Sequence, residues 1–256
     1  MGLTLSSPRN VLSPGSPSPQ NAYALITGAT SGIGRDLADD LCQRGLNVII
    51  HGRDDAKVER VVQQLRDQHP SCEVKGLVLD AATAFSASGE PKEATWNALA
   101  WVKDVNLKVL VNNVGVGHDP TKDFVVFTDQ TPASANSSDP SFIINSGSLA
   151  EQGLPWISVY SGTKAYIMGF SKGLDTELKG EGQHVEVISA LIGDTDSDGH
   201  KVGTSLFTPS SKAMAGMILD SAAGAGSVPY RLLQKGMIYN VAGLREKNGP
   251  VRKKQA

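Results

Sequence analysis

The sequence predicts an α/β fold, in which helices cover both faces of a doubly wound parallel sheet. Two observations favour this class. Short apolar runs alternate with stretches of helical spacing along most of the 256 residues. A glycine-rich turn joins the first apolar run to the first helical stretch. The formal net charge of −2 gives no electrostatic argument for nucleic acid, and no apolar run is long enough to predict a membrane span.

We expect a single domain over residues 22–245, between a disordered Ser/Pro-rich tail at 1–21 and a basic tail at 246–256. The two cysteines, Cys42 and Cys72, form no framework and no metal-ligand cluster, so we expect a reducing compartment and no metal site. We therefore predict a cytoplasmic protein. The last four residues, Lys-Lys-Gln-Ala at 253–256, resemble a dilysine signal, which leaves endoplasmic reticulum association as an alternative.

The first strand is expected at residues 22–26, and a helical pattern follows the glycine-rich turn up to Gly45. In such a turn, backbone N–H groups approach a pyrophosphate closely, and the helix N-terminus favours its negative charge. The alternative is an ordinary strand-to-helix turn rich in glycine. The cofactor-binding residues expected here are Thr27, Gly28, Thr30, Ser31, Gly32, Ile33, Gly34 and Arg35.

The second strand, expected at 47–50, leads to Arg53 with no carboxylate before it. A guanidinium holds a 2′-phosphate in bidentate fashion, and Arg35 is a second cation for the same group. We therefore favour NADP(H) over NAD(H), the alternative being that both arginines are ordinary surface charges. A helix at 54–69 and a strand at 74–79 follow, and Asp80 closes the edge where the adenine is expected.

A second group of motifs lies in the central and C-terminal parts of the chain. We predict a helix at 94–105, strands at 107–111, 142–145 and 185–191, and helices at 159–179 and 212–222. Tyr160 and Lys164 lie four residues apart, hence on one face of their helix. A nearby ammonium lowers a tyrosine pKa, so the pair can exchange a proton with a carbonyl or an alcohol. The alternative is a partly buried tyrosine beside a solvated lysine.

The glycine turn at 27–34, Asn-Asn-Val-Gly at 112–115 and Tyr-x-x-x-Lys at 160–164 together resemble the short-chain dehydrogenase/reductase family over residues 22–225. The resemblance is greatest to the 3-oxoacyl-CoA reductase and 17β-hydroxysteroid dehydrogenase branch. It implies a Rossmann-like single domain in which Tyr160 is the acid/base, Lys164 lowers its pKa and holds the nicotinamide ribose, and Ser148 polarises the substrate carbonyl. Ser146 is the alternative serine. The further cofactor contacts that it implies are Asn112, Asn113, Gly115, Tyr160, Lys164, Gly193 and Thr195.

The chain departs from the family between Gly115 and Phe142, where a long helix normally supplies a relay asparagine and a dimer face. The stretch 116–141 contains three prolines and no amphipathic helix. We therefore expect this helix to be missing and homo-oligomerisation through it to be in doubt.

The resemblance implies an oxidoreductase that interconverts a ketone and a secondary alcohol. The ketone would be a 3-oxoacyl thioester or a steroid-like compound. Its partners would be small molecules, with no nucleic acid and no membrane span. Two alternatives stay open. One is a dinucleotide-binding protein whose catalysis is impaired by loss of the relay helix, and the other is a chain that does not fold stably.

Overall fold

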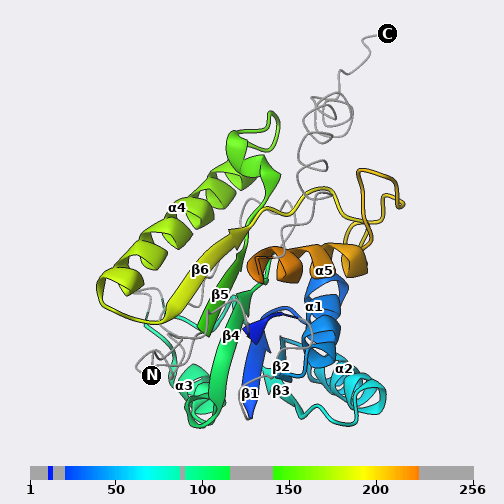
Figure 1. Cartoon of the computed structure of the whole chain (residues 1–256), viewed down its shortest axis with the longest axis vertical. Helices are drawn as coiled ribbons and strands as arrows, with labels where there is room; N and C mark the ends of the chain where they lie inside the picture. Colours follow the sequence, from blue (N-terminus) through cyan, green and yellow to red (C-terminus); the bar gives the residue numbers. More distant parts are fainter. Residues whose placement is uncertain (1–10, 14–20, 87–89, 116–140, 225–256) are drawn as a thin grey trace, which may run out of the picture.

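The structure is a computed structural model that describes residues 11–13, 21–86, 90–115 and 141–224 (Figure 1). Its centre is a parallel sheet of six described strands in the order β3-β2-β1-β4-β5-β6. The strands are β1 (Ala22–Ile26), β2 (Asn47–Gly52), β3 (Val74–Val78), β4 (Asn106–Asn112), β5 (Ser141–Ser146) and β6 (Val185–Ala190). The expected α/β class with a doubly wound parallel sheet is confirmed.

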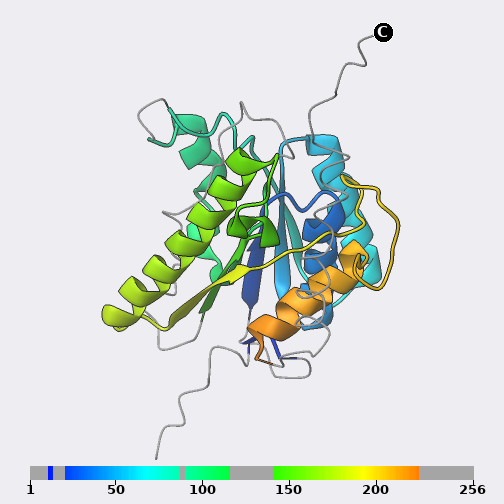
Figure 2. The same cartoon turned by 90° about the horizontal axis from the view of Figure 1, so that it is seen from above.

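Helices cover both faces of the sheet, as Figure 2 shows from above. On one face lie α1 (Gly32–Gln43), α2 (Asp55–Gln68) and α5 (Ser211–Ala222). On the other lie α3 (Glu93–Leu99) and the long α4 (Ser158–Gly180). Side-chain caps begin two of these helices, since Asp54 accepts a hydrogen bond from the Lys57 amide and Ser210 accepts one from the Ala213 amide.

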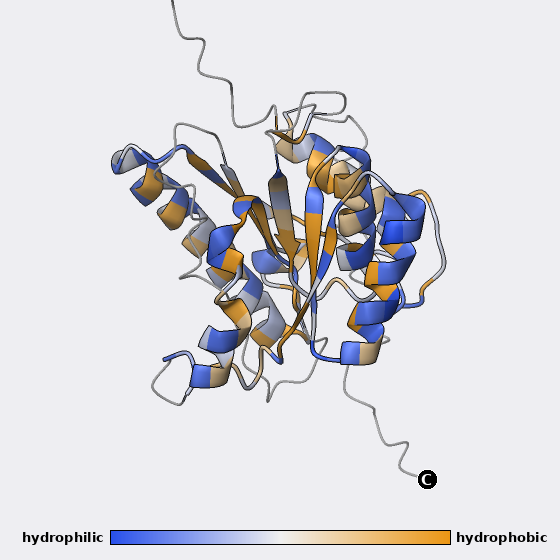
Figure 3. Ribbon diagram, turned by 90° about the horizontal axis from the view of Figure 1, so that it is seen from below, coloured by the Kyte–Doolittle hydropathy of each residue, from blue (hydrophilic) through white to orange (hydrophobic). Residues whose placement is uncertain are grey.

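The strands divide their side chains between two cores, one on each face. In β1, Ala24 and Ile26 pack with α1 and α5, whereas Tyr23 and Leu25 pack with residues of α3 and α4. Figure 3 shows apolar residues on both sheet faces and on the helix sides that meet them. Because both faces are buried, β1, β2, β4 and β5 are largely apolar, which is why the sequence indicated them clearly.

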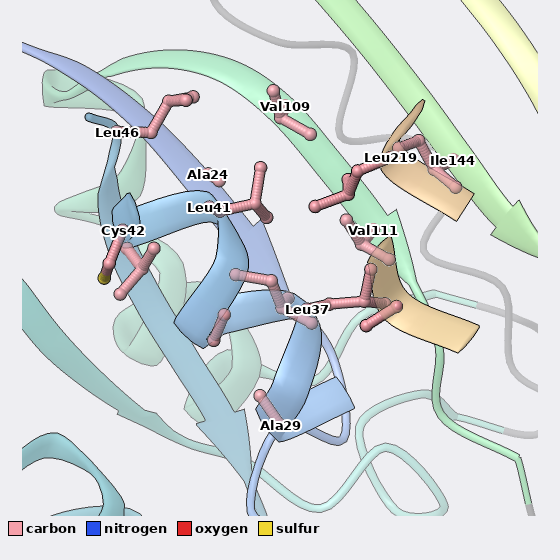
Figure 4. Packing of buried hydrophobic residues seen from close by; sticks show 14 of the residues in the cluster. Ala24, Ala29, Leu37, Leu41, Cys42, Leu46, Val109, Val111, Ile144 and Leu219 are labelled. Carbon is pink, nitrogen blue, oxygen red and sulfur yellow. The ribbon is translucent and has the colours of Figure 1, made fainter. Parts of the chain in front are cut away.

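The packing of α1 places the glycine turn at the carboxyl edge of the sheet. Leu37 and Leu41 of α1 are fully buried against β1 and β4, near Ala24 and Val109 (Figure 4). The chain reverses its winding between β1 and β4, its neighbour in the sheet. Ligands of doubly wound sheets bind at this switch point, outside the carboxyl ends of the strands.

Two expectations need correction. Within the predicted disordered tail, Val11 and Leu12 are buried in the core, and the Arg44 guanidinium donates to the Leu12 carbonyl at 2.6 Å. Two apolar side chains and one carbonyl that accepts from Arg44 are enough to dock residues 11–13. The helix predicted at 94–105 ends at Leu99, because residues 101–105 bond from i to i+3 and turn the chain into β4.

Several sequence expectations lie outside the described residues: the missing helix of 116–140, most of the tail at 1–21, the domain end at 225–245 and the basic tail at 246–256. In the described part of the chain, no helix combines the length and the apolar character that crossing a membrane requires.

Candidate active site

The glycine turn between β1 and α1 is built around close backbone contacts. Gly28 has φ of +64°, in the left-handed region that glycine favours. A Cβ on Gly34 would lie 2.5 Å from both the Gly28 carbonyl oxygen and the Asn113 Nδ2 atom. The first turn of α1 therefore packs directly on the loop, and its backbone is left bare where a phosphate would approach.

Thr27 and Asn113 hold this turn from the β4 side. The Thr27 hydroxyl accepts from the amides of Asn113 and Val114, at 2.8 and 3.1 Å, and contacts the Val111 carbonyl oxygen at 3.2 Å. The Asn113 side-chain amide donates to the Thr27 carbonyl at 3.1 Å. Both side chains are thus engaged within the protein, so the part they can play toward a cofactor is to shape the turn.

His51, at the end of β2, holds the same turn from the other side. Its Nδ1 atom accepts from the Gly28 amide at 3.2 Å, and its carbonyl accepts from the Ala29 amide at 2.9 Å. The side chain is buried, and burial lowers the pKa of His51 to about 4, so the ring is neutral and can accept. The sequence analysis did not indicate this bond between the end of β2 and the glycine turn.

The remaining turn residues line the N-terminus of α1. Ser31 is the exposed N-cap, and Ile33 packs against the core. Thr30 packs closely against Gly52 of β2, where a larger residue would clash with it. The Gly32 amide donates to the Asp198 carboxylate at 3.4 Å. This contact brings the segment after β6 across the place where the resemblance puts a pyrophosphate.

The residues expected near the adenosine lie at the same edge of the sheet. Arg53 is exposed just after β2, and Arg35 lies in the first turn of α1, 3.5 Å from the Asp36 carboxylate. Asp80, just beyond β3, is half-buried and accepts from the Ala82 amide at 3.1 Å. Both arginines thus lie at the carboxyl edge of the sheet, one just after β2 and the other in the first turn of α1.

Asn112 belongs to a buried polar network that the sequence did not indicate. Its side-chain amide donates to Asn145 at 2.8 Å, and Asn145 donates to the Ser171 hydroxyl of α4 at 2.9 Å. Within the described part of the structure, Asn112 Oδ1 is buried with no hydrogen-bond partner. The network ties the carboxyl ends of β4 and β5 to α4, the helix that carries Tyr160.

Ser148, Tyr160 and Lys164 converge at the start of α4. The Ser148 side chain lies close enough to that of Tyr160 to oppose the rise of its pKa, and the Ser148 hydroxyl accepts from the Ala150 amide at 3.2 Å. Lys164 Nζ lies 5.6 Å from the centroid of the Tyr160 ring. The hydroxyl of the alternative serine, Ser146, lies instead 3.4 Å from Asn113 Oδ1, so the geometry favours Ser148.

The expectation that Lys164 lowers the Tyr160 pKa is corrected by the structure. Burial raises the pKa of Tyr160, and the opposing influence is the Ser148 side chain. Lys164 Nζ donates to the Ser146 carbonyl at 2.7 Å, and burial lowers the pKa of Lys164 to about 8. Desolvation therefore disfavours both charged forms, the tyrosinate and the ammonium, and keeps the phenol protonated at neutral pH.

The last expected cofactor contacts follow β4 and β6. Gly115 is exposed at the end of a described segment. Gly193 and Thr195 follow β6, and the buried Thr195 hydroxyl donates to the Gly193 carbonyl at 3.0 Å. The expected site residues thus gather along one edge of the sheet. Parallel strands bring their carboxyl ends together, and that rule was also the signal that would have placed His51 beside Gly28.

Comparison with known proteins gives a family model and distant relatives. Residues 22–134 match the model described as short chain dehydrogenase. The very-long-chain 3-oxoacyl-CoA reductase of Emericella nidulans is 26% identical over 82% of this chain and 65% of its own length. The putative steroid dehydrogenase 1 of Caenorhabditis elegans is 28% identical over 78% of this chain and 68% of its own. The chain spans just under two thirds of the reductase.

Solved structures share the fold at low identity. A short chain dehydrogenase from Burkholderia cenocepacia, in complex with NADP, has a TM-score of 0.63 and 21% identity, over 81% of this chain and 92% of its own. A 3-oxoacyl-[acyl-carrier protein] reductase from Brucella melitensis, with bound NAD, has a TM-score of 0.60 and 20% identity, over 90% and 92%. Both structures contain a nicotinamide dinucleotide, and they differ in which one.

Proposed function

Because the chain belongs to the short-chain dehydrogenase/reductase family, we propose that it is an NADP(H)-dependent oxidoreductase that interconverts a ketone and a secondary alcohol. One observation carries the proposal. The neighbouring side chains of Ser148 and Tyr160, with Lys164 one turn further along α4, lie at the same sheet edge as the glycine turn. A proton donor and a dinucleotide cradle at one edge are what carbonyl reduction requires.

The residues of the turn fit a dinucleotide. The backbone around Gly28 and Gly34 is so close that a side chain on Gly34 would fill the contact. The α1 N-terminus offers amides to a pyrophosphate. Arg53 and Arg35 are the groups that would hold a 2′-phosphate, and they support NADP(H) over NAD(H).

The protein's own part in the reaction is a proton transfer. The Ser148 and Tyr160 hydroxyls would both donate to the substrate carbonyl oxygen and orient it. Tyr160 then gives its proton to that oxygen as charge develops there, which suits a phenol whose raised pKa keeps it protonated at neutral pH. Lys164 would hold the nicotinamide ribose and offset the negative charge left on Tyr160. When bound, the cofactor supplies or accepts the hydride.

The names of the relatives suggest two substrate classes. A 3-oxoacyl thioester and a steroid-like ketone both present a ketone beside a large apolar group, and the exposed apolar side chains of Leu206 and Phe207, in the segment between β6 and α5, are candidates to contact such a group. Lipid metabolism is therefore the proposed context. Endoplasmic reticulum association through residues 253–256 and homo-oligomerisation stay predictions.

The first experiment is a thermal-unfolding titration of the full chain with NADPH and, in parallel, NADH. A ligand that binds the folded state alone raises stability by about 2.7 kcal/mol at a hundredfold excess over Kd. We expect a shift with NADPH and little with NADH, and an Arg53→Ala variant that shifts equally with both. A cooperative transition that neither cofactor moves would contradict the proposal.

Turnover is then measured as ketone-dependent oxidation of NADPH, with 3-oxoacyl thioesters and steroid ketones as substrates. Tyr160→Phe is the matched control. It should keep cofactor binding and lose about 10² to 10⁴ in rate, the typical contribution of a positioned proton donor. Binding by the wild-type chain without turnover on either class would favour the alternative function, a dinucleotide-binding protein with impaired catalysis.

A further inference from the structure

Cys42 and Cys72 form a pair outside the candidate active site. Cys42 lies in the last turn of α1, at the opposite end from the glycine turn, and Cys72 lies between α2 and β3 (Figure 4 shows Cys42). Their sulfur atoms are 2.8 Å apart, although the sequence predicted no framework between them. Both cysteines are free thiols in this structure.

Rigid elements hold both residues in place. Cys42 is part of a buried helix turn that packs in the core. The Cys72 amide donates to the His69 carbonyl at 2.9 Å, and the neighbouring Glu73 amide donates to the Asn47 side chain at 2.8 Å. Since a disulfide bond is about 2.05 Å long, bond formation needs the sulfurs to approach by less than about 1 Å.

We propose that Cys42 and Cys72 form a reversible intrachain disulfide by exchange with a small-molecule disulfide such as glutathione disulfide. The proposal is independent of the proposed enzymatic function. The chain contains two cysteines, so this is the one intrachain bridge open to it. In a reducing compartment such bridges are transient and report the redox state rather than form part of the permanent structure.

The two thiols differ in a way that sets the order of events. Cys72 is partly exposed, whereas Cys42 is 6% exposed. The Cys42 hydrogen bond lowers the pKa of Cys72, and that contact together with burial raises the pKa of Cys42. Cys72 is therefore the attacking thiolate, and Cys42 is the resolving residue.

The exchange balances in two steps. The Cys72 thiolate attacks one sulfur of glutathione disulfide, which forms a mixed disulfide and releases one glutathione thiolate. Cys42 loses its proton and attacks the Cys72 sulfur, which releases the second glutathione and leaves the Cys42–Cys72 bond. The protein dithiol is oxidised by two electrons, glutathione disulfide is reduced to two glutathione molecules, and the two thiol protons end on these.

The bridge would tie the C-terminal end of α1 to the turn before β3, and the two cysteines are 30 positions apart in the sequence. A loop of this size restricts the unfolded chain, and the expected effect is a rise in Tm of roughly 5–15 °C. The glycine turn lies at the other end of α1, so cofactor affinity should change less than twofold.

The test equilibrates the reduced full-length chain in glutathione buffers of increasing disulfide fraction, blocks the remaining thiols with maleimide and measures intact mass. We expect a direct change from two labelled thiols to none, with the bridge between Cys42 and Cys72 peptides, a monomeric band on non-reducing gels, and the Tm rise. Dithiothreitol should reverse all of these.

Two serine variants are matched controls. Cys42→Ser should stop at one glutathione adduct on Cys72, and Cys72→Ser should leave Cys42 unmodified in the folded chain. The proposal is overturned if the wild-type chain keeps both thiols until denaturant is added, accumulates glutathione adducts instead of the bridge, or forms disulfide-linked dimers.

Discussion

The Gly28 amide donates a hydrogen bond to Nδ1 of His51 at 3.2 Å, so a buried imidazole at the end of β2 fixes the turn proposed to hold the cofactor. The bond needs the neutral ring, because a protonated imidazole has no acceptor. The low pKa of His51, about 4, ensures this across the physiological range.

Two substitutions of His51 distinguish the role of its hydrogen-bond acceptor from that of its ring volume. His51→Leu leaves the Gly28 amide unpaired, which typically costs about 1–3 kcal/mol, and should weaken NADPH binding by about tenfold or more. His51→Asn retains an acceptor near the Nδ1 position and should bind within about threefold of wild type. Fluorescence titration with NADPH measures both. Equal loss in the two variants would show that ring volume, not the hydrogen bond, shapes the turn.

His51 also predicts an acid dependence of stability. Between pH 6.5 and about 4 the unfolded chain binds a proton at this residue and the folded chain does not, so unfolding becomes easier as the pH falls through this window. The loss is on the order of 3 kcal/mol by pH 4. Urea unfolding of wild type and His51→Asn at several pH values measures it, and parallel curves for the two proteins would refute the assignment.

Lys164 predicts a dependence of the same sign at alkaline pH. Its folded pKa of about 8 lies below the ordinary 10.5, so between these values the unfolded chain carries the extra proton and stability rises with pH. The gain is on the order of 3 kcal/mol before the raised pKa of Tyr160 reverses the trend above pH 10.

Lys164→Met removes the titrating group and should flatten the stability curve between pH 8 and 10. The absolute stability of the variant also changes, because the Ser146 carbonyl loses its donor, so the slope is the quantity to compare. A wild-type curve that is flat over this window would mean that Lys164 keeps an ordinary pKa in solution.

Asp198 places a carboxylate 3.4 Å from the Gly32 amide, at the α1 N-terminus where a pyrophosphate would bind. Two like charges compete for this end of the helix, and one such interaction near 4 Å in water amounts to about 1 kcal/mol. Asp198→Asn should therefore tighten NADPH binding about fivefold, with a smaller gain at high salt.

The control for Asp198→Asn is Asp67→Asn, which changes the net charge equally at an exposed position of α2. Calorimetric titration of the three proteins gives the affinities. Weaker binding in Asp198→Asn would mean that this carboxylate supports the cofactor loop rather than opposing the ligand.

The sequence predicted the elements well where their pattern is local. Buried parallel strands are apolar on both faces, so 22–26, 107–111 and 142–145 stand out as runs, and β1, β4 and β5 contain them. The helix at 94–105 was too long because helical spacing does not report where the hydrogen bonds change from i+4 to i+3.

Contacts between distant elements were not predictable from the pattern. Nothing local to Cys42 or Cys72 indicates that the end of α1 meets the turn before β3. The raised Tyr160 pKa was missed for a related reason. Spacing puts Lys164 on the same helix face, but burial and the Ser146 carbonyl, which depend on the packed fold, decide where its ammonium points.

The contact between Gly34 and the glycine turn gives a last test of the site. A Cβ at this position would lie 2.5 Å from the Gly28 carbonyl oxygen and from Asn113 Nδ2, so Gly34→Ala must push α1 away from the turn. Such overpacking costs about 1–3 kcal/mol, and NADPH binding should be lost because the displaced amides no longer converge.

Gly173→Ala is the matched control. It lies within α4, where an added Cβ meets no atom within 4 Å, and an interior helical alanine is more stable than glycine by up to about 1 kcal/mol. We therefore expect Tm to fall in one variant and rise in the other, with binding lost in the first alone. Undiminished NADPH binding in Gly34→Ala would show that the close contact of α1 with the turn is not what prepares this site.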